Sequence, residues 1–256
     1  MKKNKKIKIL FLDILTGDKK IKKDIENKVY QGGTYGEHIR KIFGLSKKEL
    51  VVLDGSKNIS AKPSKYDAII MGGSVENPVK NIERPWMKKV YKFILEAIDK
   101  NVPILGICGG LQFVVRALGG EIIPNPKGRE FGSVNINITQ AGMRDRLFRG
   151  LPKNIIIQSS HKCILKGLRS KWTLLASSNL CDIQAIAIGK NIRLLQFHPE
   201  MISRQIKALA QMRKEPLLRE GFVGNEKEFK EFLSSIKNTE KTGKKILQNF
   251  IKYFVV

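Results

Sequence analysis

The first half of the chain alternates short apolar runs with stretches in which apolar residues recur at helical spacing. Four runs are continuous enough for strands that are buried on both faces: 7–15, 50–54, 67–71 and 102–107. Apolar residues three and four positions apart predict helices over 85–100 and 111–118, and a further helix is expected from Glu37. The polar, glycine-containing segment 16–36 predicts a loop before it. Strands alternating with helices predict an α/β fold of three layers, a mostly parallel sheet flanked by helices.

After residue 120 the pattern becomes richer in strands. Five segments have a strand-like pattern: 134–138, 155–157, 172–176, and a hairpin formed by 183–188 and 192–197. We expect this strand-rich second half to extend the sheet. Three later segments have the pattern of helices: 202–212, 226–236 and 241–253. The sequence therefore predicts one domain over 1–200 and a C-terminal helical extension over 201–256, packed on the same domain.

Composition narrows the class of protein. The chain has 256 residues, of which 42% are hydrophobic, and this excludes a disordered protein. Its three cysteines cannot all pair and match no metal-ligand spacing, so we expect a reducing cytoplasm and no metal site. No run approaches the ~18 to 20 apolar residues that span a bilayer, so no membrane association is expected. The lysine-rich start, Met1–Lys6, precedes a run interrupted by Lys8 and Asp13, which argues against a signal peptide.

The chain is strongly basic, with 48 Lys and Arg against 23 Asp and Glu and a formal charge of +25. The excess is spread along the whole length and consists mostly of lysine. Proteins that read nucleic acids usually concentrate basic and aromatic residues on one element, and no element of this sequence does so. We therefore expect a general lysine bias, with salt-sensitive attraction to polyanions but no specific nucleic-acid partner.

The sharpest local motif is Gly106–Ile107–Cys108–Gly109–Gly110, which leaves a predicted strand and enters a predicted helix. It has the form of a nucleophile elbow, a tight turn that holds the nucleophile in a strained backbone conformation. A cysteine at a helix N-terminus is favoured as the thiolate, and the free N–H groups there can bind an oxyanion. The alternative is a buried core cysteine beside an ordinary glycine turn.

A nucleophilic cysteine needs a base, and His198 follows the last predicted strand. Residues two apart in an extended segment project to one side, so Glu200 can orient the His198 imidazole, and Pro199 between them stiffens the segment. Parallel strands end at one edge of a sheet, which would bring Cys108, His198 and Glu200 together. These residues predict a catalytic triad of nucleophile, base and orienting carboxylate.

These motifs resemble those of class I glutamine amidotransferases. Residues 106–112 resemble the family's G-x-C-x-G-x-Q elbow, and residues 197–200 its F-H-P-E segment. Other matching pieces follow in the family's order: residues 71–74, Pro85–Trp86, residues 128–132 and Ser160–His161. The resemblance covers roughly residues 65–200 and is closest to the stand-alone group related to the amidotransferase domain of GMP synthase. It implies the flavodoxin-like class I glutamine amidotransferase fold.

The resemblance also implies roles for further residues. Cys108 would attack the γ-carboxamide carbon of glutamine, with the backbone N–H groups of Gly73 and Gly109 as the oxyanion hole. Gln112, and the backbone around Ser160 and His161, match positions that hold the substrate in the family. No metal and no cofactor is implied.

Some residues depart from the family or carry no predicted role in catalysis. The family often has an aromatic residue where this chain has Gly109, and an acidic residue where it has Cys163. Both departures weaken an assignment to GMP synthase specifically. We expect Cys163 and Cys181 to be structural, and His38 to lie at the surface.

Three functions remain open on sequence grounds. The first is a glutaminase-type amidotransferase that passes ammonia to a separate synthetase subunit, since no phosphate-binding loop is present and 56 residues follow Glu200. The second is a stand-alone hydrolase of γ-glutamyl amines or peptides that uses the same triad. The third is a catalytically idle regulatory or binding protein, against which the intact Cys108, His198 and Glu200 argue.

Overall fold

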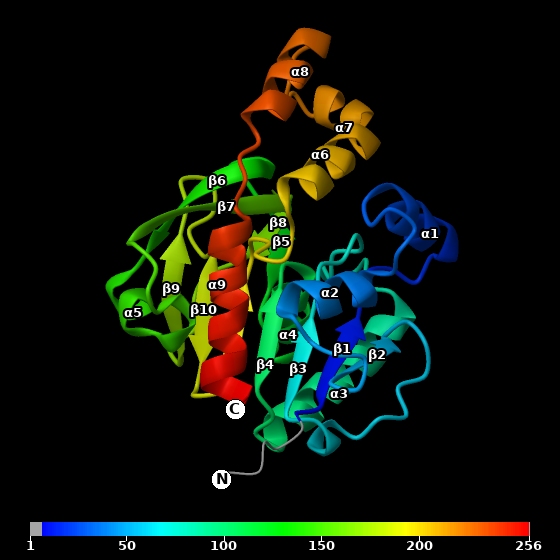
Figure 1. Cartoon of the computed structure of the whole chain (residues 1–256), viewed down its shortest axis with the longest axis vertical. Helices are drawn as coiled ribbons and strands as arrows, with labels where there is room; N and C mark the ends of the chain where they lie inside the picture. The colour runs from blue at the N-terminus through cyan, green and yellow to red at the C-terminus, as the bar shows by residue number, and fades with distance from the viewer. Residues whose placement is uncertain (1–6, 256) are drawn as a thin grey trace.

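The computed structural model describes residues 7–255, and the lysine-rich start of the chain lies outside this range. A nine-stranded sheet runs in the order β2-β1-β3-β4-β11-β10-β9-β6-β7 (Figure 1). In that order the strands are Leu50–Asp54, Ile9–Asp13, Ala68–Met71, Ile104–Ile107, Ile192–Leu195, Ala185–Ile188, Trp172–Ser177, Glu130–Ile138 and Asn154–His161. The first five are parallel and the others pair antiparallel. A separate two-stranded sheet pairs β5 (Ile122–Pro124) with β8 (Cys163–Leu165).

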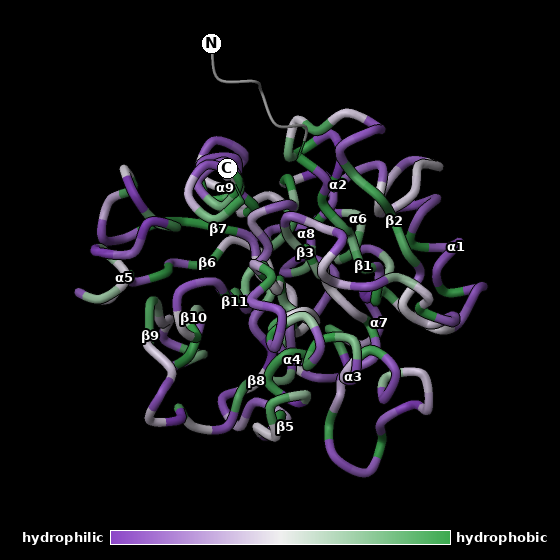
Figure 2. Tube along the Cα trace, turned by 90° about the horizontal axis from the view of Figure 1, so that it is seen from below, coloured by the Kyte–Doolittle hydropathy of each residue, from purple (hydrophilic) through white to green (hydrophobic). Residues whose placement is uncertain are grey.

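Alternation along the strands explains why both faces of the sheet are covered. In β1, Ile9 and Phe11 belong to one hydrophobic cluster, while Leu10 and Leu12 belong to the other. Successive strand side chains point to opposite faces, so a fully apolar strand needs helices on both sides. Figure 2 shows hydrophobic residues following the central strands and mostly hydrophilic residues over α1. The structure confirms the predicted three-layer α/β fold with its mostly parallel sheet.

Helices cover the two faces of the parallel part of the sheet. In Figure 1, α2 (Tyr35–Phe43) lies in front of it, and α3 (Pro85–Asp99) and α4 (Gly109–Ala117) lie behind, while α9 (Glu240–Phe250) lies in front of the antiparallel part and contacts β7. The remaining helices are α1 (Lys19–Lys28), α5 (Gln140–Arg144), α6 (Ser203–Met212), α7 (Lys214–Arg219) and α8 (Glu226–Ser235). None of the helices within residues 7–255 is long and apolar enough to cross a membrane.

The C-terminal helices are part of the same packed body as the sheet. Residues of α6 and α9, among them Ile206, Leu209, Ile246 and Phe250, belong to the hydrophobic cluster that includes Phe11 of β1. Figure 1 shows α6, α7 and α8 beyond one end of the sheet, while α9 returns along its face. The helices α6 and α7 therefore stand at the end where the parallel strands finish.

Three helices were missing from the sequence-based prediction: α1, α5 and α7. The segment 16–36, expected to be a loop, contains α1, whose N-terminus is capped by the Asp18 carboxylate accepting from the N–H groups of Lys20 and Ile21. Ile25 is the one buried residue of α1, so the segment lacks the repeated apolar positions that would have predicted a helix. The short helix α7 was also not predicted, because Pro216 and its few apolar residues give no helical pattern.

Candidate active site

Cys108 stands at the turn between β4 and α4 with a φ of 51°, a left-handed conformation that is strained for a residue with a side chain. Its N–H donates to the Leu195 carbonyl of β11 at 2.6 Å, which ties the turn to the neighbouring strand. Two glycines allow the close packing: a Cβ on Gly106 would lie 2.7 Å from the Gly110 carbonyl carbon, and one on Gly110 2.5 Å from the Met71 oxygen. The fold thus holds the thiol at the N-terminus of α4.

His198 and Glu200 lie directly after β11, the strand beside β4. The backbone N–H of His198 donates to the Gln158 carbonyl at 2.7 Å, which fixes the segment against β7. The His198 Nδ1 and the Glu200 Oε1 are 2.7 Å apart, and both side chains are buried. Cys108 and His198 line the same narrow cavity. The structure therefore brings the three predicted triad residues together.

The charges of the site favour an ionised His198. Burial disfavours the charged ring, but the Glu200 carboxylate and the negative charge of the Cys108 sulfur outweigh it and raise the pKa of His198 to about 10. Burial likewise opposes ionisation of Glu200, yet the facing imidazole lowers the pKa of this carboxyl below its usual range. At neutral pH the arrangement is an imidazolium held between a carboxylate and a sulfur.

Tyr35, which sequence reasoning did not single out, joins the triad to the backbone after β3. Its hydroxyl donates to the Glu200 Oε1 at 3.0 Å and accepts the N–H of Gly73 at 2.8 Å. Gly73 lies against His198, since a Cβ there would be 3.0 Å from the His198 Cε1. Tyr35 is completely buried at the N-terminus of α2.

This bond bears on the predicted oxyanion hole. The Gly73 N–H is already bonded to Tyr35, so in this conformation it is not free to receive an oxyanion. Gly109 is the first residue of α4, so its N–H has no carbonyl partner within that helix. Of the two predicted donors, Gly109 is the one whose position suits the role directly.

His38, which was expected at the surface, is half-buried in the structure. Its Nε2 lies 2.8 Å from the Glu200 carbonyl oxygen, and Gln205 of α6 contacts the other side of the ring. Burial lowers the pKa of His38, although the nearby Glu200 opposes the change. A neutral His38 that donates to this carbonyl fixes the backbone of the triad glutamate. Its place in the same α2 turn as Tyr35 explains why both reach Glu200.

The three residues predicted to hold the substrate have different surroundings. Ser160 and His161 line the pocket that contains Cys108. The His161 Nε2 lies 2.9 Å from the buried Glu130 carboxylate, which orients the ring. Gln112 is buried, and its amide donates to the Cys163 carbonyl at 3.1 Å. It is not among the described residues that line that pocket, so it lies behind the wall and not in it.

The pocket in front of Cys108 has a volume of about 500 Å³. Its walls come from α1, α6 and α7 as well as from the strand ends, and they carry three guanidinium groups, Arg129, Arg213 and Arg219. Arg129 forms a two-pronged ion pair with Glu220, at 2.6 and 2.9 Å. The arginines were not found from the sequence, because single arginines carry no signal in a chain this basic.

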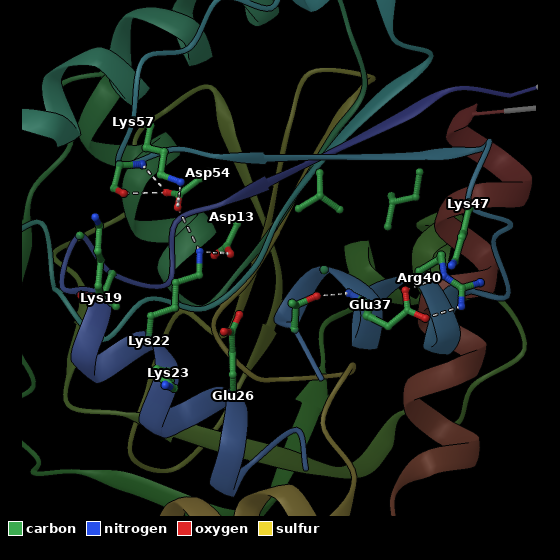
Figure 3. A pocket seen from close by; sticks show the side chains of 17 residues that line it. Asp13, Lys19, Lys22, Lys23, Glu26, Glu37, Arg40, Lys47, Asp54 and Lys57 are labelled. Atoms are coloured by element: carbon green, nitrogen blue, oxygen red, sulfur yellow. Dashed lines mark hydrogen bonds and ion pairs between the residues drawn. The ribbon is translucent and has the colours of Figure 1, made fainter. Parts of the chain in front are cut away.

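A larger hollow of about 860 Å³ lies at the ends of β1 and β2 and lacks the triad (Figure 3). Its charges mostly neutralise one another: Lys22 contacts Asp13 at 2.7 Å and Asp54 at 3.3 Å, and Arg40 contacts Glu37 of the same helix. Its described lining residues include neither a cysteine nor a histidine, and none of the predicted triad residues lies in it.

Comparison with known proteins agrees with this architecture. The chain is 34% identical over 139 residues to a glutamine-hydrolyzing GMP synthase subunit of Methanoregula boonei, covering 54% of this chain and 67% of the relative. It is 29% identical over 151 residues to gamma-glutamyl peptidase 4 of Arabidopsis thaliana, covering 58% and 59%. The crystal structure of a glutamine amidotransferase from Thermotoga maritima superposes with a TM-score of 0.76 at 20% identity, over 98% of this chain and 99% of that one.

The family model for class I glutamine amidotransferases matches residues 32–212. The match begins after α1 and ends before α7, although both helices form walls of the pocket. Since the match spans well over half of the sequence, the chain belongs to the class I glutamine amidotransferase family.

Proposed function

We propose that this protein is a cysteine-dependent amidohydrolase that releases glutamate and ammonia from glutamine. The observation that carries the proposal is the 2.7 Å contact between His198 and Glu200 beside a cysteine held at a helix N-terminus. The family membership supports it, as does the likeness to a glutamine-hydrolyzing GMP synthase subunit.

The first half-reaction forms a thioester. The Cys108 sulfur attacks the γ-carboxamide carbon, and the C–O π electrons move to the oxygen, which the Gly109 N–H can stabilise. The His198 imidazolium gives its proton to the amide nitrogen as the C–N bond breaks, so ammonia leaves and a γ-glutamyl thioester remains. Gly73 joins the oxyanion hole if substrate displaces the Tyr35 hydroxyl from its N–H.

The second half-reaction regenerates the enzyme. His198, now neutral, takes a proton from water, and the hydroxide attacks the thioester carbon. The C–S bond breaks with its electron pair on sulfur, glutamate is released, and Cys108 again faces an imidazolium. Glu200 keeps the ring oriented and balances its charge through both steps.

A second candidate is hydrolysis of γ-glutamyl peptides or amines by the same steps, with an amine in place of ammonia. Two observations favour it. The pocket, at about 500 Å³, is within the range that holds whole small ligands, and α1 and α7 build walls outside the family match. The relatives include gamma-glutamyl peptidases. If glutamine is the substrate, we propose that a separate synthetase subunit receives the ammonia.

The test is glutamate release from purified protein with L-glutamine and, in parallel, a panel of γ-glutamyl amines and dipeptides. Cys108→Ala is the control and should lose all turnover while its circular dichroism spectrum is unchanged. Preferred turnover of glutamine supports the amidotransferase, and preferred turnover of the amines supports the γ-glutamyl hydrolase. Turnover retained by Cys108→Ala would overturn the mechanism, and a wild-type protein silent on every substrate would favour the idle regulatory protein.

A further inference from the structure

Arg213, in the wall of the pocket at Cys108, is a cation that forms no ion pair with any described carboxylate. Arg213 follows α6 and lines both the main pocket and its narrow extension of about 30 Å³, which Cys108, His198 and Ser160 also line. Its Nη1 donates to the Ser160 hydroxyl at 2.7 Å, and its guanidinium lies 6.0 Å from the centre of the Phe131 ring. Within residues 7–255 no carboxylate lies within ion-pair distance of Arg213.

The surroundings of Arg213 make the absence of an ion-pair partner energetically unfavourable. Glu220, an acidic residue of the same pocket, is already engaged by Arg129 through two hydrogen bonds. Burial and the charge of Arg129 lower the pKa of Arg213 to about 10, although the charges of Cys108 and Glu220 oppose the change. A partly buried charge is expensive unless it is paired, so an unpaired guanidinium that borders a pocket favours an anionic ligand there.

The donor geometry of the guanidinium limits the class of ligand that Arg213 can bind. Arg213 has five N–H donors in a planar fork, and one of them is used by Ser160. None of its nitrogens is among the buried polar atoms that lack a partner, so the unused donors are reachable from the pocket. A planar fork matches a carboxylate, which it can bind with two parallel hydrogen bonds.

We infer that Arg213 binds the α-carboxylate of the γ-glutamyl substrate. The inference rests on the proposed function, because it assumes that the γ-carbonyl carbon lies at Cys108. Cys108 and Arg213 both line the pocket of about 500 Å³, so a ligand whose γ-carbonyl carbon reaches the sulfur also lies beside the guanidinium. The α-carboxylate is present in glutamine and in every γ-glutamyl compound with a free α-carboxyl group, whichever amine they carry.

The assignment gives the C-terminal helices a role in selecting the substrate. Arg213 is the residue directly after the family match, so the cation comes from a segment that the matched region does not include. The enzyme would then accept variation in the amine half of its substrate and reject compounds whose α-carboxylate is blocked.

The experiment is calorimetric binding in the Cys108→Ala background, which removes turnover. The ligands are L-glutamine and γ-L-glutamylglycine, each also as its α-amide, and γ-L-glutamylglycinamide, which lacks only the glycine carboxylate. We expect the α-amides to bind about 10- to 100-fold more weakly, as loss of a charged hydrogen-bonded pair implies. Arg213→Gln should weaken the α-carboxylate ligands by the same factor and leave the α-amides nearly unchanged.

Two further variants test whether Arg213→Gln acts on binding and not on folding or on overall charge. Arg213→Lys keeps the charge without the fork and should retain part of the affinity, which separates a binding role from a folding defect. Lys207→Gln removes a charge from the exposed face of α6 and should change no affinity. Equal weakening of the α-amides by Arg213→Gln, sensitivity to the glycine carboxylate instead of the α-carboxylate, or no binding of any ligand would each overturn the inference.

Kinetics distinguish this inference from the proposed function. In otherwise wild-type protein, Arg213→Gln should raise KM for α-carboxylate substrates with little change in kcat, because the contact is equal in the ground state and the transition state. If the wild type hydrolyses none of these substrates while the Cys108→Ala protein shows the expected binding pattern, the proposed function fails, but Arg213 is still shown to bind the α-carboxylate of these compounds as ligands.

Discussion

The hydroxyl of Tyr35 accepts the backbone N–H of Gly73 at 2.8 Å, while the same oxygen donates to the triad carboxylate. One side chain thus contacts both a predicted oxyanion donor and Glu200. If Gly73 belongs to the proposed oxyanion hole, substrate has to compete with Tyr35 for this N–H, because the N–H cannot donate to both oxygens equally well.

Tyr35→Phe should destabilise the protein. The substitution leaves the Gly73 N–H without its partner and removes one bond to the buried Glu200, which costs about 1–3 kcal/mol. Urea unfolding followed by circular dichroism measures the loss. Tyr30→Phe is the matched control, because the Tyr30 hydroxyl is buried beside Tyr35 and has no hydrogen-bond partner in the described structure. Equal losses in the two variants would contradict the network.

The three cysteines should differ in reactivity. Burial raises the pKa of Cys163 and raises that of Cys181 to about 12, so both remain thiols at pH 8, whereas Cys108 lines the pocket beside an imidazolium. Brief treatment with iodoacetamide should modify Cys108 alone, as read by peptide mass spectrometry. Unfolded protein, in which all three should react, is the control. Comparable labelling of Cys163 or Cys181 in the folded protein would refute this prediction.

Activity should persist far into the alkaline range. His198 has its pKa raised from 6.5 to about 10, so the imidazolium that protonates the leaving group is lost only as the pH rises through that value. The alkaline limb of kcat/KM is therefore expected near pH 10. The same shift stabilises the fold: its contribution is complete below about pH 6.5 and disappears as the pH approaches 10. An alkaline limb near pH 7 would disprove the ionised pair.

Glu200→Gln should move that limb toward lower pH. The carboxylate is the main influence that holds the pKa of His198 up against burial, and the amide lacks its charge. We expect kcat to fall by about 10²- to 10⁴-fold, as is typical for impaired acid–base catalysis. The measurement is a full pH–rate profile beside Glu215→Gln, an exposed residue of α7 whose substitution should leave the profile in place. An unchanged limb in Glu200→Gln would contradict the assigned partner.

Glu130→Ala should be among the most destabilising single changes. The buried carboxylate accepts from His161, Ser159, Ser178 and Gln184. Its removal leaves several buried polar groups unpaired, which we expect to cost about 3–5 kcal/mol. Glu121→Ala removes an exposed carboxylate that faces Lys166 at 3.2 Å and should cost less than about 1 kcal/mol. Chemical unfolding of both variants measures the difference, and similar midpoints would argue against the Glu130 network.

The sequence predicted well the parts of the fold that depend on local pattern. The apolar strands of the parallel sheet and the helix α3 carry strong periodic signals, and the structure has them close to the expected positions. The helix α1 was missed because packing of one residue, Ile25, and a cap hold a mostly polar segment. Tertiary contacts, which no window of sequence contains, decided its conformation.

The same distinction holds at the site. Cys108, His198 and Glu200 follow strands that end at one edge of a sheet, so their proximity could be expected from topology. Tyr35 and Arg213 come from a helix start and a helix end whose positions depend on how the layers pack. Since any arginine or tyrosine of this chain has the same local appearance, the sequence gives no reason to choose these two.

The left-handed backbone at Cys108 is strained for a residue with a side chain, yet the proposed reaction requires the cysteine thiol. Glycine adopts a φ of 51° without strain, so a Cys108→Gly chain should gain stability as it loses its thiol. A protein library screened for heat resistance alone would therefore enrich inactive members with glycine here. Retention of a side chain at this turn identifies position 108 as one where selection for stability and selection for reactivity pull in opposite directions.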